Sequence, residues 1–309
     1  MSRTHDRIAL TGWPFDLAAT LNSGQVFHWH RLEDGGFAGL IGSTPVGLSQ
    51  PSPDLLLCTR GTASLVRHYL ALDHDLPALA ATFPADDEGL RRAVAWCPGL
   101  RILRQPPWEC LATFITSSLK QVPHIRQISL TLRQRFGAPV SHPGLPDQWA
   151  YPSPAVLASA GENALRACGL GYRAAFLHRT ARDIAEGRFD LSAVAALPDD
   201  EARAALCMLH GVGEKIANCA LLFGWERAAA FPIDVWVERV LRCLYFGNDP
   251  AIPAKTLRRF AAAHFGPSAG YAQQFLFHHA RLSGALNLPE ESAERSAGLP
   301  PSAKRKSSF

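Results

Sequence analysis

The residues best suited to chemistry are a lysine and an aspartate nineteen positions apart, Lys215 and Asp234. Lys215 lies in the segment 206–219, LCMLHGVGEKIANC, whose two glycines flank a valine. This pattern predicts a helix, a tight reversal and a second helix. Lys215 falls in the first turn of that second helix, where the dipole disfavours a cation and so favours the neutral, nucleophilic amine.

Asp234 follows a proline by two positions and opens a segment with helical apolar spacing, which predicts that it is an N-cap. A rigid carboxylate there also suits the stabilisation of positive charge. Cys219 lies four residues after Lys215, so the thiol and the amine share one helix face. A small buried apolar side chain is the alternative role for Cys219.

The reversal between the two helices is suited to binding an anion. Backbone amides of Gly213 and its successors point outward at a helix N-terminus, where unpaired donors and the dipole attract negative charge. A DNA phosphate is the natural anion for a mildly basic protein. A plain turn between helices remains the alternative for this segment, because a Gly-x-Gly pattern alone is a weak signal.

The chain has 309 residues, 47% of them hydrophobic and 19% charged, and a net charge of +4. This composition is typical of a globular protein and compatible with a nucleic-acid partner. No apolar run reaches the roughly 18 residues of a membrane span, and no signal-type apolar segment follows the N-terminus. Seven cysteines without a CxxC pair favour a reducing compartment. We therefore expect no membrane partner and no secretion: a cytoplasmic or nucleoid protein in a bacterium, a nuclear one in a eukaryote.

The sequence has two parts that differ in their pattern of apolar residues. Segments 37–42 and 55–59 are short and bounded by Gly, Pro and Ser, which predicts antiparallel strands, and 63–72 predicts a helix. After residue 99, long segments carry apolar residues every three to four positions. We predict an α+β fold: a small N-terminal antiparallel β-sheet domain with a helix (1–97), packed on a larger all-helical domain (98–288). The remainder, 289–309, is rich in Ser, Glu, Pro and Lys and is predicted to be disordered.

Five segments in order resemble the helix-hairpin-helix DNA glycosylases, and specifically the 8-oxoguanine DNA glycosylases. They are NSGQVFHW (22–29), LRILRQPPWEC (100–110), GLGYRA (169–174), LHGVGEK (209–215) and AGYAQQFLF (269–277). The resemblance runs from about residue 10 to 285, and five motifs in one order are a strong signal where any one would be weak. It implies a helix-hairpin-helix glycosylase domain and a base-excision-repair enzyme that acts on damaged double-stranded DNA as a monomer.

The resemblance implies that Lys215 attacks the sugar C1′ and expels 8-oxoguanine, forming a Schiff base that permits strand cleavage by β-elimination. Asp234 would stabilise the cationic sugar. The enzyme would therefore be a bifunctional glycosylase and apurinic/apyrimidinic-site lyase.

The implied base pocket consists of Gly24, Cys219, Gln273 and Phe277. The Gly24 carbonyl would accept the N7–H that 8-oxoguanine has and guanine lacks; leaving such a group unpaired costs about 1–3 kcal/mol. Cys219 and Phe277 would sandwich the flipped base, and Gln273 would bind its Watson–Crick edge. Gln273 and Phe277 are four residues apart, hence on one helix face. Core packing is the alternative role for Phe277.

The implied DNA contacts are spread over four segments. Tyr172 would intercalate where the base was, unless it packs in the core, and Arg173 would contact the orphaned partner base. Lys120 is predicted to contact a phosphate. The alternative is that it is a solvent-exposed surface residue without a specific role. The remaining implied contacts are Gly211, Gly213, Gln121, His124 and Trp236.

This sequence departs from the family in two places. Leu119 replaces a polar gap-filling residue, and His124 replaces an arginine that reads the opposite cytosine, so looser recognition of the opposite base is expected. Trp236 stands where a histidine often contacts the phosphate beside the lesion, and Ala280 stands where the acidic partner of that histidine would be. Both members of the pair are therefore absent together.

No cofactor is expected to be required. No four-cysteine set follows Asp234, which argues against an iron–sulfur cluster. As in the family, the hairpin is suited to a monovalent cation, or Mg²⁺ or Ca²⁺, on the backbone carbonyls of Cys207, Leu209 and Val212.

Two alternative functions remain open. A glycosylase for other damaged purines, such as alkylated ones, is compatible with the altered 119–124 segment, although such relatives generally lack the lysine. A non-catalytic DNA-damage-binding module would keep the hairpin but would need neither Lys215 nor Asp234.

Overall fold

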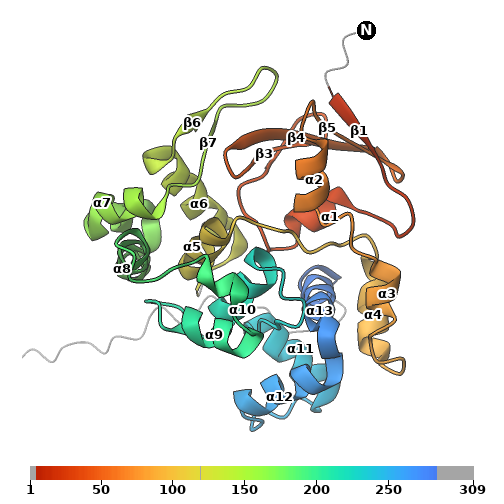
Figure 1. Ribbon diagram of the computed structural model, residues 1–309. Coiled ribbons are helices and arrows are strands. Elements are labelled where there is room, and N and C mark those ends of the chain that lie inside the picture. Colours follow the sequence, from red (N-terminus) through yellow and green to blue (C-terminus); the bar gives the residue numbers. More distant parts are fainter. Residues whose placement is uncertain (1–4, 119, 284–309) are drawn as a thin grey trace, which may run out of the picture.

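The structure is a computed structural model that describes residues 5–118 and 120–283 (Figure 1). Its N-terminal part is a five-stranded antiparallel sheet with the order β1-β5-β4-β3-β2. The strands are β1 (His5–Ala9), β2 (His30–Arg31), β3 (Phe37–Ile41), β4 (Thr44–Ser52) and β5 (Leu55–Thr59). The strands predicted at 37–42 and 55–59 are β3 and β5. Strand β4 was not predicted, because its prolines, Pro45 and Pro51, interrupt the usual pattern.

Two helices belong to this part, α1 (Leu17–Asn22) and α2 (Ala63–Tyr69). The apolar core between them and the sheet includes Ile8, Leu21 and Tyr69. Tyr69 is fully buried, and its hydroxyl accepts a hydrogen bond from the Trp29 indole at 3.1 Å. The predicted small β-sheet domain is therefore built around one apolar cluster that α2 covers.

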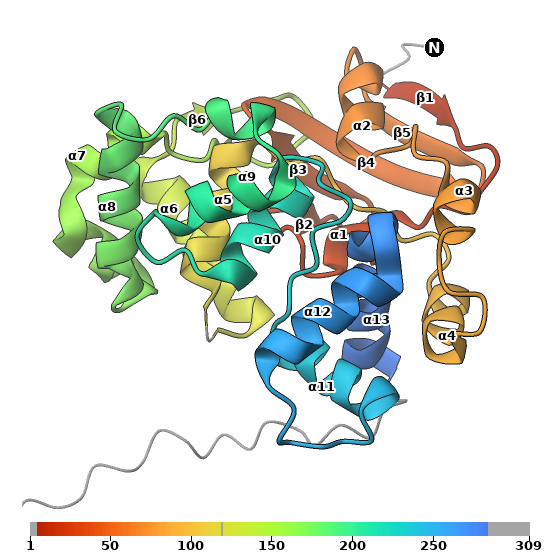
Figure 2. The same ribbon diagram turned by 60° about the horizontal axis from the view of Figure 1, so that its bottom comes forward.

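The rest of the described chain is mostly helical (Figure 2). Its helices are α3 (Leu76–Ala80), α4 (Glu88–Trp96), α5 (Pro107–Ser117), α6 (Val122–Phe136), α7 (Pro154–Leu165), α8 (Arg173–Ala185), α9 (Asp199–Cys207), α10 (Glu214–Gly224), α11 (Val235–Tyr245), α12 (Ala254–Phe265) and α13 (Ala269–Ser283). A short hairpin, β6 (Pro139–Val140) with β7 (Gln148–Trp149), interrupts the part that was predicted to be entirely helical. The predicted α+β class is otherwise what the structure shows.

A second, larger apolar core joins the helices. Leu90 and Ala93 of α4 belong to it together with residues of α13 such as Tyr271 and Leu276. Packing therefore crosses residue 97, and the domain boundary there remains a sequence prediction. The segment 289–309 lies outside the described residues. Among the described helices, none combines the length and apolar character that crossing a membrane requires.

The segment before α5 joins the two cores. The amide of Arg104 donates to the Tyr69 carbonyl at 2.9 Å, and the amide of Gln105 donates to the Phe223 carbonyl of α10 at 2.8 Å. Backbone hydrogen bonds therefore connect the sheet side of the molecule with the helix that carries Lys215.

Candidate active site

The helical hairpin consists of α9, a turn at 208–213 and α10. Gly211 has φ +76°, and a Cβ placed there would lie 2.6 Å from the Phe176 Cβ, so only glycine fits. Gly213 has φ −97°, and a Cβ there would meet open space. The Thr180 hydroxyl donates to the His210 carbonyl at 3.0 Å, which holds the turn against α8. The two glycines thus have different functions: Gly211 allows the close approach to α8, and Gly213 leaves the N-terminus of α10 uncovered.

Lys215 is the second residue of α10 and is half-buried. Its Nζ lies 5.3 Å from the centroid of the Phe114 ring of α5. One turn later, Cys219 is buried, and burial raises the pKa of its thiol to about 11, an effect that the hydrogen bond and charge of Lys215 oppose. The thiol and the amine therefore meet on one face of α10, as the i, i+4 spacing predicts.

Asp234 caps α11. Its Oδ1 accepts a hydrogen bond from the Val237 amide at 2.8 Å, which confirms the predicted N-cap. Burial raises the pKa of the carboxyl, and the Val237 amide and the positive charges of Lys215 and Arg281 act in the opposite direction. The charges of Lys215 and Asp234 act on each other, and both act on the Cys219 thiol. The structure therefore brings the three predicted residues together: Lys215 and Asp234 at the starts of α10 and α11, and Cys219 one turn further along α10.

Gly24 faces the side chains of α13. It has φ +86°, and a Cβ there would lie 3.1 Å from Cε1 of Phe277. Gln273 lies one turn before Phe277 on the same helix and is buried. Its Oε1 has no hydrogen-bond partner among the described residues. A buried acceptor without a partner suits the N–H donors on the Watson–Crick edge of a purine.

The Gly24 loop is fixed by its neighbour Gln25. The Gln25 amide nitrogen donates to the carbonyls of Thr20 and Arg101 and to the Ser23 hydroxyl at 2.7–3.2 Å, and its oxygen accepts from the Leu103 amide at 2.7 Å. The side chain is fully buried. A loop held by four such bonds presents the Gly24 backbone in one position, which discrimination by a carbonyl requires.

Four of the eight predicted DNA contacts lie on open surface. Gln121 and His124 are exposed at the start of α6, and Lys120 just before it is half-buried. Tyr172 is 49% exposed, with its ring edge-to-face against Phe176. Exposure excludes the core alternative for Tyr172.

Trp236 and Leu119 are two of the positions at which the sequence departs from the family it resembles. Trp236 is half-buried in the first turn of α11, with the Arg239 guanidinium 5.8 Å from the centre of its ring. Leu119 lies outside the described residues.

Arg173 differs from its prediction. The residue is only 4% exposed, and its guanidinium donates to the carbonyls of Ser118 and Leu170. Its Cζ also lies 4.4 Å from the centre of the Tyr172 ring. A direct contact with an orphaned base is therefore not available to Arg173 in this conformation. The residue instead holds the end of α5 and supports Tyr172 from beneath, because a buried guanidinium needs its protein acceptors.

Sequence reasoning missed Arg281 and Arg126, which lie beside the predicted pocket. Arg281 donates to the Asn22 carbonyl at 2.7 Å, and its Cζ lies 5.2 Å from the centre of the Phe277 ring. The spacing of Gln273, Phe277 and Arg281 at i, i+4 and i+8 was the available signal for the first of them. Arg126 had no comparable signal, since only folding brings α6 to Asn22.

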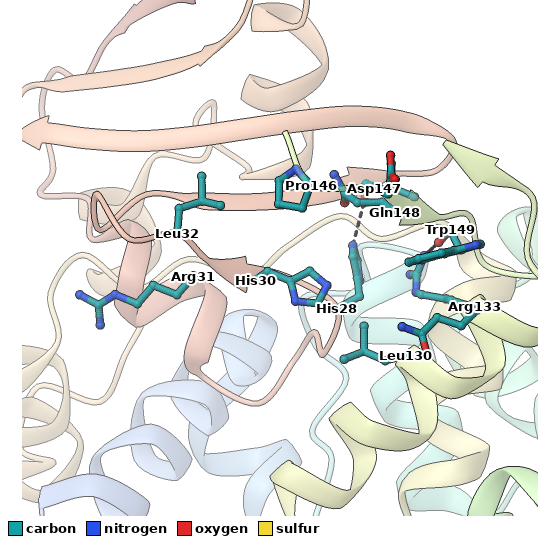
Figure 3. A pocket seen from close by; sticks show the side chains of 12 residues that line it. His28, His30, Arg31, Leu32, Leu130, Arg133, Pro146, Asp147, Gln148 and Trp149 are labelled. Carbon is teal, nitrogen blue, oxygen red and sulfur yellow. Dashed lines mark hydrogen bonds between the residues drawn. The ribbon is translucent and has the colours of Figure 1, made fainter. Parts of the chain in front are cut away.

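A separate cavity of about 240 Å³ lies between the N-terminal sheet, α6 and the β6–β7 hairpin (Figure 3). His28, His30, Arg133 and Trp149 are among the residues that line it. None of the predicted catalytic or base-pocket residues does, so this cavity is distinct from the site at Lys215.

Comparison with known proteins assigns this arrangement to a family. Residues 7–111 match the N-terminal domain of 8-oxoguanine DNA glycosylase, and residues 114–263 match the HhH-GPD superfamily base excision DNA repair protein. The chain is 30% identical over 305 residues to a probable N-glycosylase/DNA lyase of Methanothermobacter thermautotrophicus, covering 88% of this chain and 96% of that protein. The chain belongs to the 8-oxoguanine DNA glycosylase family. The predicted family is thereby confirmed.

Solved structures agree with this membership. A Clostridium acetobutylicum 8-oxoguanine glycosylase/lyase, in complex with double-stranded DNA containing cytosine opposite 8-oxoG, superposes with a TM-score of 0.84 at 28% identity, covering 92% of this chain and 97% of that one. MBOgg1 in complex with a low-affinity DNA ligand gives a TM-score of 0.85 at 28% identity, with coverage of 92% and 98%. The chain is therefore a DNA-binding glycosylase/lyase of this family, and its predicted fold class and enzyme class are confirmed.

Proposed function

We propose that this family member removes 8-oxoguanine from duplex DNA and cleaves the strand through a Schiff base on Lys215. The observation that supports this most directly is the convergence of Lys215 and Asp234, at the N-termini of α10 and α11, with Cys219 one turn along α10. A binding module has no use for a half-buried amine beside a half-buried carboxylate, whereas a glycosylase/lyase needs both.

In the proposed reaction, the neutral amine of Lys215 attacks C1′ while the bond from C1′ to the base breaks. The departing electron pair stays on the base, which takes up a proton. The sugar carries positive charge as the bond breaks, and the nearby Asp234 carboxylate stabilises it electrostatically. The bound amine then loses one of its two protons, and the sugar ring opens as O4′ leaves C1′ and takes up a proton. This forms an iminium between the lysine nitrogen and C1′, which keeps one N–H. Loss of the C2′ proton then expels the 3′-phosphate, and hydrolysis of the iminium regenerates the lysine.

The proposed selectivity rests on Gly24. Its carbonyl, fixed by the Gln25 hydrogen bonds, would accept the N7–H of 8-oxoguanine and would face a lone pair on guanine. The resulting difference of about 1–3 kcal/mol corresponds to roughly a five- to 150-fold preference. Phe277 would stack on the base. The Gln273 oxygen, which has no partner within 5–118 and 120–283, would accept a hydrogen bond from the Watson–Crick edge of the base.

The proposed reaction draws on this chain's own side chains and requires no cofactor. We also propose that the enzyme acts as a monomer and that the hairpin carbonyls of Cys207, Leu209 and Val212 bind a monovalent cation. The residues fit this role in part, because the Leu209 carbonyl already accepts the Val212 amide at 3.2 Å and retains one free lone pair.

Borohydride trapping tests the proposal. Duplex containing 8-oxoguanine opposite cytosine should form a covalent adduct with the native enzyme and none with Lys215→Gln. Lys255→Gln is the matched control, because Lys255 is also the second residue of a helix, α12, but is exposed. This variant should form the adduct normally.

Other outcomes would identify the alternatives. If the native enzyme forms an adduct only on abasic or alkylated DNA, its substrate is another damaged purine and not 8-oxoguanine. Failure of the native enzyme to form an adduct on every damaged duplex would refute the proposed lyase chemistry.

A further inference from the structure

Two arginines from different helices meet on one asparagine at the edge of the predicted base pocket. Arg281 of α13 donates through Nη2 to the Asn22 carbonyl at 2.7 Å. Arg126 of α6 donates through Nη2 to the Asn22 Oδ1 at 3.2 Å. Asn22 is the last residue of α1 and lies two positions before Gly24. The side-chain amide and the backbone carbonyl of Asn22 thus hold two guanidinium groups close together.

Neither arginine has an ion-pair partner in the part of the chain that the structure describes. Among residues 5–118 and 120–283, no carboxylate oxygen lies within 4.0 Å of either guanidinium. The Nε atoms of both arginines are buried without a hydrogen-bond partner in the same set. Burial lowers the pKa of Arg281, the more distant Asp234 carboxylate raises it, and the charge of Arg126 lowers it further. Two like charges held together in this way need an anion.

The position of Arg281 indicates where that anion would lie. A Cβ placed on Gly24 would be 3.0 Å from its Nη1, and the guanidinium also contacts the Phe277 ring. It is close enough to Asp234 for their charges to interact. The arginine therefore lies between the Gly24 loop and the start of α11, at the edge of the space assigned to the flipped nucleotide.

We propose that Asn22, Arg126 and Arg281 form a binding site for a backbone phosphate adjacent to the flipped nucleotide. This inference rests on the proposed function, because it requires the damaged nucleotide to occupy the site beside Gly24. A phosphate fits better than a base oxygen, since two guanidinium groups match a charged, multidentate acceptor and exceed what one neutral carbonyl needs.

The site would supply positive charge that the first turn of α11 lacks. Trp236 carries no charge, and Ala280 precedes Arg281 directly on α13. A phosphate held by the arginines would also screen Asp234 from their charge, leaving the carboxylate available to the sugar. Arg281 and Arg126 are binding residues in this proposal, and neither takes part in bond breaking.

A double-mutant cycle between protein and DNA tests the site. The duplex contains a tetrahydrofuran abasic analogue, and a methylphosphonate replaces the phosphate on its 5′ or its 3′ side. The native enzyme should lose about tenfold or more in affinity when the contacted phosphate is neutralised. The double variant Arg126→Met/Arg281→Met should bind the unmodified duplex at least about tenfold more weakly than the native enzyme does. Its affinity should not fall further on the methylphosphonate duplex. Its log–log salt slope should fall by about 1.

Two variants guard against misfolding. Arg281→Lys keeps a charge at the site without the two-pronged guanidinium and should lose part of the affinity, with an unchanged thermal midpoint. Arg92→Met removes an arginine whose side chain is 69% exposed on α4, and it should respond to the methylphosphonates as the native enzyme does.

Two results would overturn the proposal. One is a double variant that still loses as much affinity as the native enzyme on each methylphosphonate duplex. The other is a defect confined to 8-oxoguanine duplex with normal binding to the tetrahydrofuran duplex, because Arg281 would then contact the base. Either result leaves borohydride trapping through Lys215 intact, so it is distinguishable from failure of the proposed function.

Discussion

At the scale of single residues, Asp234 has two functions that one substitution can separate. Its Oδ1 accepts the Val237 amide at the start of α11, and its charge interacts with Lys215. Asparagine caps helices about as well as aspartate does but carries no charge. The cap and the electrostatic function therefore respond differently to Asp234→Asn.

We expect Asp234→Asn to change the free energy of unfolding by less than about 1 kcal/mol and to retain duplex binding. Single-turnover base release should fall by about a hundredfold or more, because the cationic sugar loses its counter-charge. Urea unfolding and quenched-flow assays measure the two quantities. A severe loss of binding or stability with preserved turnover would mean that Asp234 is mainly a helix cap.

The pH dependence of base release gives a second prediction for the same residue. Burial raises the pKa of Asp234 above its ordinary value of 3.8, so the carboxylate takes up a proton at higher pH than a free aspartate does. Single-turnover release should therefore decline, as pH falls, before 3.8 is reached. A rate that stays constant down to about pH 4 in a folded enzyme would contradict an ionised Asp234 as the stabilising group.

At the scale of elements, the hairpin uses its two glycines for different physical reasons. Gly211→Ala introduces a Cβ 2.6 Å from Phe176 at φ +76°, so we expect a loss of at least about 1–2 kcal/mol in the free energy of unfolding. Gly213→Ala meets no atom within 4 Å and should cost less than about 1 kcal/mol.

Gly213→Ala is thus the matched control for stability, and it should weaken duplex binding because its methyl group covers the exposed amides of α10. Thermal unfolding and DNA titration separate the two effects. Equal stability losses in both variants would contradict the assignment of the close approach to Gly211.

At the scale of the whole molecule, a buried ionic cluster connects the sheet with the helices. Glu109 of α5 pairs with Arg133 of α6, and its Oε1 also lies 3.2 Å from Nδ1 of His28. The His28 Nε2 lies 2.7 Å from the Leu40 carbonyl of β3. Burial lowers the pKa of His28 and raises that of Glu109. Helix α5 also carries Phe114, whose ring lies beside Lys215. The cluster therefore helps to hold in place the helix that contacts this lysine.

Arg133→Met should lower the free energy of unfolding by about 3–5 kcal/mol, because it leaves the Glu109 charge buried without its partner. The double variant Glu109→Leu/Arg133→Met should recover much of that loss, since no charge remains to be buried. Urea unfolding measures both, with the exposed Arg92→Met as the control. A small effect of Arg133→Met alone would show that Glu109 is already neutral in the native state.

The sequence alone determined the local features of the site. Glycine at a reversal, a lysine in the first helical turn and an N-cap aspartate follow from short-range geometry, so the hairpin and Asp234 were predictable. The i, i+4 spacing similarly placed Cys219 with Lys215 and Gln273 with Phe277. Ordered motifs then fixed the family, because several independent short matches in one order rarely coincide by chance.

The tertiary structure decided which side chains face outward and which distant elements meet. Arg173 has the positive charge and the motif position of a DNA contact, but packing buries its side chain against Ser118. Arg126 and Arg281 reach Asn22 only because α1, α6 and α13 converge there. The local spacing of residues specifies a helix or strand and which of its faces is apolar. Which distant element packs against that face depends on long-range contacts, which residue spacing does not encode.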